Sequence, residues 1–216
     1  MAQLNSEKRA MPYRNLGGTG LMVSALSFGT MTLQDLADEV PGKISRGEEA
    51  FELLQACYKG GVNFFDCAEV YGGGGSSERV LGQCIQTGIE RGLWGRQDLV
   101  ISTKIHGGGR GNLDTINSIG LSRKHLYEGL KASLGQLQLE YVDLVLCHRP
   151  DPRTPLEEVV RGMNHLIDRG MTFCESACMR MRMPSASAPA RAHSPLPALS
   201  LPPLVLFSVL PAGLLV

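Results

Sequence analysis

The 216-residue chain lacks an excess of charge of either sign, because 21 basic side chains balance 21 acidic ones. A chain without a strong positive field offers no electrostatic basis for binding nucleic acid or an anionic membrane. Its six cysteines include no Cys-x-x-Cys pair and no cluster with histidines at zinc spacing, so we expect no metal site. Residues 1–14 contain no apolar stretch typical of a secretion signal. These absences favour a soluble protein of a reducing compartment, and we expect a cytoplasmic location.

Glycine and proline divide the chain into unequal parts. All glycines except Gly213 lie at or before Gly170, whereas seven of the 12 prolines lie within residues 184–211. Repeated prolines remove backbone donors and break helices. We therefore expect a flexible N-terminus over 1–12, a folded region over 13–173 and an unstructured tail rich in proline, alanine and leucine over 174–216. Three prolines interrupt the uncharged stretch 199–216, so no membrane span is expected there.

Strand and helix signals alternate within residues 13–173. Four apolar segments, at 26–28, 62–65, 99–103 and 142–147, are typical of buried strands. Helices are predicted over 48–58, from Ser76 or Ser77, from Ser122, and from Thr154, where Glu157 indicates a capping box. Strands that alternate with helices form parallel βαβ units. A doubly wound sheet and a (β/α) barrel both fit this pattern.

Side chains with useful chemistry stand where these strands end. Thr30, Asp66, Lys104 and His148 follow the four strands in turn, and Tyr71 lies in the loop after Asp66. The carboxyl ends of neighbouring parallel strands face one crevice, so we expect these side chains to lie together. Each of them alone could be a loop cap or a solvated residue, and it is their joint placement that predicts a site.

These residues predict an acid catalyst. A free phenol has a pKa of about 10 and seldom gives up its proton at neutral pH, but a neighbouring ammonium stabilises the phenolate. Asp66 would keep Lys104 protonated beside Tyr71, and His148 would orient a carbonyl oxygen by hydrogen bonding. Such a group suits carbonyl reduction, in which a developing alkoxide must receive a proton. No side chain donates hydride, so a nicotinamide cofactor is implied.

Several segments resemble a known family. The segment 66–72, Asp-Cys-Ala-Glu-Val-Tyr-Gly, resembles the Asp-x-Ala-x-x-Tyr-Gly signature of the aldo-keto reductases, and segments 13–17, 29–31 and 103–104 add to it. Segments 120–125, 137–143 and 149–152 are similar to the branch that contains voltage-gated potassium channel beta subunits and related bacterial aldehyde reductases. The resemblance extends from about Tyr13 to Phe173.

The resemblance implies a fold, a cofactor and a set of site residues. The fold is α/β, of the (β/α)8 TIM-barrel type, and the chain would hold roughly its first half: a hairpin over 13–24, strands one to four and the start of strand five. The implied cofactor is NADP(H), and the substrate is a small aldehyde or ketone. The catalytic positions are Tyr71 as proton donor, Lys104 and Asp66 as its partners, and His148; the cofactor-binding positions are Thr30, Met31, Asp66 and His148.

The second half of the family's pattern has no counterpart after Phe173. That half carries the residues that bind the carboxamide, stack on the nicotinamide and bind phosphate, so the resemblance implies a reductase that is inactive or impaired in this chain. Two other hypotheses stay open: a regulatory subunit like the channel beta subunits that binds NADP(H), and a non-functional fragment. Besides a carbonyl substrate, the partners would then be a channel subunit or a second copy of the chain.

Overall fold

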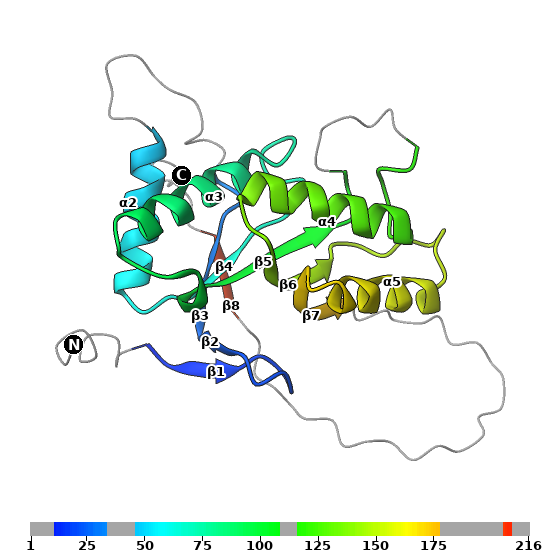
Figure 1. The fold of residues 1–216 in the computed structure, drawn as a ribbon, viewed down its shortest axis with the longest axis horizontal. Helices are drawn as coiled ribbons and strands as arrows, with labels where there is room; N and C mark the ends of the chain where they lie inside the picture. Colours follow the sequence, from blue (N-terminus) through cyan, green and yellow to red (C-terminus); the bar gives the residue numbers. More distant parts are fainter. Residues whose placement is uncertain (1–10, 34–45, 109–115, 178–204, 209–216) are drawn as a thin grey trace, which may run out of the picture.

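The structure, a computed structural model, describes residues 11–33, 46–108, 116–177 and 205–208 (Figure 1). Six described strands form one parallel sheet in the order β7-β6-β5-β4-β3-β8. From β3 to β7 each strand pairs with the next one along the chain, which is the winding of a (β/α) barrel. The strands are β3 (Leu26–Gly29), β4 (Phe64–Asp66), β5 (Val100–Ile105), β6 (Val142–Cys147), β7 (Thr172–Ala177) and β8 (Val205–Ser208).

Four helices connect the strands from β3 to β7. They are α2 (Arg46–Lys59), α3 (Ser76–Glu90), α4 (Arg123–Leu137) and α5 (Leu156–Asp168), and a short 3-10 helix (Arg96–Asp98) precedes β5. Consecutive helices contact one another (Figure 1). Their buried side chains share one core with one face of the sheet. A doubly wound sheet would carry helices on both faces, so the predicted barrel type is confirmed.

Alternate residues of each strand face different layers, which decides where the polar side chains point. Phe65 packs in the main core under the helices, whereas Phe64 and Val100 belong to a smaller cluster that includes residues of the N-terminal hairpin. Successive side chains of a strand point to opposite faces. Asp66 and Lys104 are therefore directed to the face away from the helices, the inner face of the barrel-type sheet.

The predicted N-terminal hairpin is present, with β1 (Tyr13–Asn15) antiparallel to β2 (Met22–Ser24). Its turn contains Gly17 and Gly20 at φ 58° and 78°, a conformation that glycine adopts without strain. The Tyr13 hydroxyl donates a hydrogen bond to the Gly61 carbonyl at 2.6 Å, which fixes the hairpin against the turn before β4. The hairpin thus covers the amino ends of the strands.

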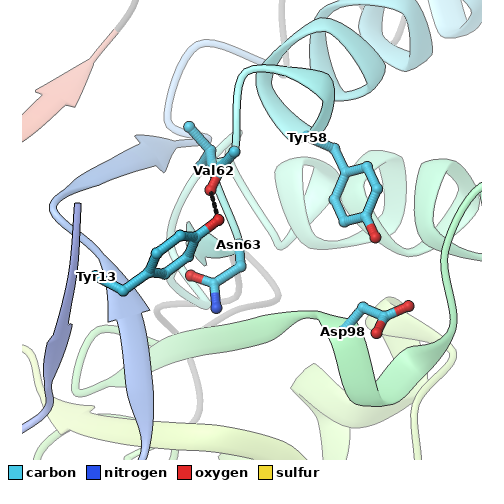
Figure 2. A pocket seen from close by; sticks show the side chains of 6 residues that line it. Tyr13, Tyr58, Val62, Asn63 and Asp98 are labelled. Atoms are coloured by element: carbon cyan, nitrogen blue, oxygen red, sulfur yellow. Dashed lines mark hydrogen bonds between the residues drawn. The ribbon is translucent and has the colours of Figure 1, made fainter. Parts of the chain in front are cut away.

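A cavity of about 190 Å³ lies beside this hairpin (Figure 2). Its walls come from the hairpin, the end of α2, the entry to β4 and the 3-10 helix, and it is therefore at the end of the strands opposite to Asp66. Two phenol rings and a carboxylate face it, and its lining residues are Tyr13, Tyr58, Gly61, Val62, Asn63 and Asp98.

Two predicted helix caps are wrong. The α3 helix follows Gly75 without a side-chain cap, and the Ser76 hydroxyl instead donates to the Gly72 carbonyl at 2.6 Å. No capping box forms at α5, because the Thr154 hydroxyl donates to the carboxylate of Asp151 at 2.9 Å. In both places a preceding loop residue provides an acceptor that competes with the helix end.

The predicted boundary at residue 173 also needs correction. The pairing of β7 with β6 continues through Leu146 with Ser176 and Cys147 with Ala177, so ordered structure extends four residues farther. Within the predicted unstructured tail, β8 forms a strand that pairs in parallel with β3. Backbone hydrogen bonds form a sheet ladder without requiring a particular side-chain pattern. Residues 1–10 and the remainder of the tail lie outside the described residues.

The contact between α3 and α4 generates a stability prediction. A Cβ atom at Gly82 would lie 2.4 Å from the Leu137 carbonyl oxygen, which belongs to backbone and cannot rotate away. We expect Gly82→Ala to lower the free energy of unfolding by about 1–3 kcal/mol, measured by urea denaturation. The control is Gly135→Ala in α4, where a Cβ meets nothing within 4 Å. Equal stability of the two variants would contradict the close helix contact.

Candidate active site

The Lys104 ammonium is the centre of the predicted site. Lys104 is only 7% exposed, and its Nζ donates to Asp66 Oδ2 at 2.5 Å, to the Cys67 carbonyl at 2.7 Å and to Tyr71 Oη at 3.2 Å. An ammonium has three N–H donors, so each one has an acceptor. Two of these acceptors belong to Asp66 and Tyr71, the residues that the sequence predicts beside the lysine.

Both oxygens of the Asp66 carboxylate accept a hydrogen bond. Its Oδ1 accepts a hydrogen bond from the Ser102 hydroxyl at 2.7 Å, while its Oδ2 accepts from Lys104. The register of the sheet explains this arrangement, because Asp66 pairs with Ser102 across β4 and β5, and Lys104 lies two residues farther on the same face. A buried ion pair costs desolvation energy unless further hydrogen bonds satisfy its oxygens, and Ser102 supplies one.

The Tyr71 ring is partly buried above the lysine. Lys104 Nζ lies 4.7 Å from the centroid of the ring, in addition to its hydrogen bond to the hydroxyl. The phenol oxygen accepts that hydrogen bond, so its own proton can be donated elsewhere. The loop after Tyr71 contains four glycines with positive φ, Gly72 to Gly75, a conformation that a side chain would strain.

His148 completes the predicted set of catalytic residues. Its backbone N–H donates to the Ile105 carbonyl at 3.0 Å, and its ring meets the Tyr71 ring edge-on with centroids 5.9 Å apart. Burial lowers the pKa of the His148 imidazole, and the positive charges of Lys104 and Arg149 lower it further. A neutral imidazole carries one N–H donor and one acceptor nitrogen, which suits it to hydrogen bond with a carbonyl oxygen.

The two predicted cofactor positions after β3 differ in exposure. Thr30 is fully buried, and both its backbone N–H and its hydroxyl donate to the Asp66 carbonyl, at 3.0 and 3.1 Å. Met31 is 47% exposed. The structure therefore places Thr30 behind Asp66 as a support, and leaves the Met31 side chain accessible to a ligand.

Comparison with known proteins identifies the family of the chain. The model of the aldo/keto reductase family matches residues 25–174. The chain belongs to the aldo/keto reductase family. Two similar plant proteins are each described as a probable voltage-gated potassium channel subunit beta: one from Arabidopsis thaliana is 51% identical over 164 residues, and one from Oryza sativa subsp. japonica is 49% identical over 164 residues.

The chain spans less than half the length of these curated relatives: the matches cover 76% of this chain and 45% of each relative. Among solved structures, a thermostable aldo-keto reductase in complex with the inhibitor epalrestat is similar at a TM-score of 0.60 and 32% identity. That likeness covers 77% of this chain and 53% of the solved one. It confirms the family fold for the region that contains the site.

In the described part of the chain, no helix is both long enough and apolar enough to cross a membrane. The same residues contain no group of three or more histidine, cysteine or acidic side chains placed to hold a metal ion. Burial raises the pKa of the Cys67 thiol next to the site, so a thiolate there is disfavoured.

Sequence reasoning missed two buried carboxylates near the site. Glu78, in the first turn of α3, accepts a hydrogen bond from the Thr103 hydroxyl at 2.5 Å on the helix side of β5. Glu69, in the loop between Asp66 and Tyr71, accepts hydrogen bonds from the loop that follows β5. The sequence does not predict their burial, because glutamate in a first turn or a loop is usually exposed.

The buried Glu78 generates a prediction on stability and pH. Burial raises the pKa of its carboxyl from 4.5 to about 7, against the hydrogen bond from Thr103, which lowers it. Between these values the folded protein binds more protons than the unfolded chain, so stability falls as pH rises from about 4.5 to 7. At roughly 1.4 kcal/mol per unit, the loss is on the order of 3 kcal/mol.

The Glu78→Gln variant should lack this loss, because glutamine does not ionise. Urea unfolding at pH 5 and pH 8 measures the free energy of unfolding of the variant and of the original protein at each pH. Glu128→Gln is the control, since Glu128 is exposed on α4 and pairs only with Lys124 one turn away. If Glu78→Gln and the original protein lose stability in parallel over this range, the carboxyl does not hold its proton in the folded state.

Proposed function

We propose that the described residues form the proton-delivering part of an NADP(H)-dependent reductase of small aldehydes and ketones. The observation that supports it is the hydrogen bond from Lys104 Nζ to Tyr71 Oη, with the same ammonium bound to the Asp66 carboxylate. A phenol held against a buried ammonium is suited to general acid catalysis. Membership of the aldo/keto reductase family is consistent with this chemistry.

The residues would act in a defined order. The His148 imidazole donates a hydrogen bond to the carbonyl oxygen of the substrate and holds it close to Tyr71. As the carbonyl carbon is reduced, its oxygen takes the Tyr71 proton, and the product leaves as an alcohol. The resulting phenolate stays beside the Lys104 ammonium, which stabilises its charge. Solvent returns the proton to Tyr71 before the next turnover.

The cofactor that the family implies is a nicotinamide nucleotide. When bound, its reduced ring supplies the hydride that no side chain can give. The residues present fit such a group: Met31 is exposed directly after β3, and the partly buried Tyr71 lies against both the buried, charge-paired lysine and the His148 ring. Met31 and His148 would contact the cofactor, while Thr30 and Asp66 would hold the wall behind it.

Replacement of the phenol hydroxyl tests the proposed acid. We expect the 216-residue chain to bind NADPH saturably and to oxidise it slowly in the presence of an aromatic aldehyde. In Tyr71→Phe the oxidation should fall by about 10²-fold or more, the usual contribution of a general acid, while NADPH binding is retained. Binding is measured by cofactor fluorescence and oxidation by absorbance. The control is Tyr127→Phe on α4, whose ring contacts His165 rather than the site.

Equal oxidation rates in Tyr71→Phe and the original chain would contradict the assignment of the acid. Failure of NADPH to raise the thermal unfolding temperature of the chain, at concentrations up to the millimolar range, would contradict the whole proposal, because a ligand that binds the folded state must stabilise it. That second result is the one expected of a non-functional fragment.

A second function, regulation through association with a channel subunit, is favoured by the names of the two plant relatives. In that case NADP(H) would be bound as a regulatory ligand, in the site described above. The Tyr71→Phe variant separates the two functions: it should abolish carbonyl reduction and leave association with a channel subunit, measured by co-purification, unchanged.

A further inference from the structure

A buried carboxylate without a role in the proposed chemistry lies inside the signature segment. Glu69 is 2% exposed and stands in the loop between the two site residues Asp66 and Tyr71. Burying a charged carboxylate is costly unless hydrogen bonds and charges compensate for the lost water. The partners of Glu69 therefore show what this side chain holds together.

Glu69 binds to the strand that carries the lysine and to the loop that follows it. Its backbone N–H donates to the Lys104 carbonyl at 3.2 Å. Its carboxylate oxygen Oε1 accepts hydrogen bonds from the backbone N–H groups of His106 at 2.5 Å and Gly108 at 3.1 Å. One residue thus joins the Tyr71 loop to β5 through both its main chain and its side chain.

A histidine from α4 supports the carboxylate from the other side. His125 is 3% exposed, and its Nε2 lies 3.5 Å from Glu69 Oε1. Burial opposes ionisation of Glu69, but His125 and the two loop N–H groups outweigh it and lower the pKa of the carboxyl. Gly129 leaves room for the pair, because a Cβ there would lie 3.2 Å from Glu69 Oε2.

The Tyr71 loop is also held by the Lys104 ammonium and by hydrogen bonds of its own, but among the described residues none of these hydrogen bonds reaches the loop that follows β5. After Tyr71 the chain passes through four glycines with positive φ, and no helix begins before Ser76. Before it, the Tyr71 N–H donates to the Ala68 carbonyl within the same loop. The backbone of Gly107 packs against Val70 so closely that a Cβ there would lie 2.4 Å from Val70 Cγ1. Among the described residues, the Glu69 carboxylate makes the hydrogen bonds that join these two loops, and the packing of Val70 on Gly107 adds an apolar contact.

We propose that Glu69 is a positioning residue, which fixes the Tyr71 hydroxyl against the Lys104 ammonium by tying the Tyr71 loop to the loop after β5. The significance of this role for catalysis rests on the proposed function, in which Tyr71 donates the proton. The geometric claim itself concerns only the folded chain and can be measured without any turnover.

Three variants of Glu69 separate the hydrogen bonds from the charge. Glu69→Ala removes both. Glu69→Asp keeps the charge, but its side chain is one methylene shorter and does not reach the His106 and Gly108 amides. Glu69→Gln removes the charge and keeps an amide oxygen at the same reach. Glu128→Ala, which removes an exposed carboxylate from α4, is the matched control.

The readouts are the NMR resonances of the Tyr71 ring, assigned by their loss in Tyr71→Phe, and the hydrogen exchange of the His106 and Gly108 amides. In Glu69→Ala and Glu69→Asp we expect the Tyr71 ring resonances to shift and the two amides to exchange roughly tenfold faster or more, because each amide loses its acceptor. In Glu69→Gln and Glu128→Ala both signals should stay close to those of the original chain.

Unchanged Tyr71 resonances in a folded Glu69→Ala or Glu69→Asp protein would overturn the proposal, and so would a Glu69→Gln protein that shifts as much as Glu69→Asp. If Glu69→Ala does not fold, as judged by circular dichroism, the comparison of Glu69→Asp with Glu69→Gln tests the proposal by itself. A shift of Tyr71 in these variants, together with no effect of Tyr71→Phe on NADPH oxidation, would support the positioning role and refute the reductase function.

Discussion

The buried ion pair between Lys104 and Asp66 is the interaction on which the rest of the site depends. A lysine so deeply buried stays charged only where anionic or polar acceptors replace water. The Nζ atom finds them in Asp66, in the Cys67 carbonyl and in Tyr71. Each of these comes from the end of β4 or the loop that follows it, so the pair also fixes the position of that loop against β5.

The parallel sheet makes this interaction available. The register places Asp66 opposite Ser102, and the alternation of strand side chains brings Lys104 to the same inner face. A register shift of one residue would turn these side chains toward the apolar core beneath the helices. Such a shift would exchange Phe64 and Phe65 between two apolar clusters, but it would bury the Asp66 carboxylate and the Lys104 ammonium among apolar side chains, which is costly. The polar side chains therefore determine the register.

The sequence predicts the site because the residues that form it lie at or just after the ends of the strands. A polar residue at the end of an apolar strand lies at the rim of a parallel sheet, and this brings together Asp66 and Lys104, while Tyr71 lies in the loop that follows Asp66. The Ser122 cap of α4 was also predictable and is confirmed, since its hydroxyl accepts from the His125 N–H at 3.2 Å. The sequence pattern does not show which hydrogen-bond partner a hydroxyl will have, and the predicted caps at Ser76 and Thr154 are wrong for that reason.

The role of Glu69 also could not be predicted, because its partners are backbone N–H groups, which every residue has. The hydrogen bond between Ser102 and Asp66 could have been predicted from the sequence, because Ser102 lies two residues before Lys104 on the same face of β5. The strand β8 had no signal, since its pairing with β3 is made by main-chain groups of a segment with no alternating pattern.

The central claim is that the Tyr71 phenol and the Lys104 ammonium meet in one place. It is tested most directly by nuclear Overhauser contacts between the Tyr71 ring protons and the side-chain protons of 13C-labelled lysine in the 216-residue chain. The account predicts cross-peaks to Lys104 that vanish in Tyr71→Ala, which has no ring, because Nζ lies 4.7 Å from the ring centroid. A folded chain whose Lys104 side chain shows no contact with Tyr71 would contradict it.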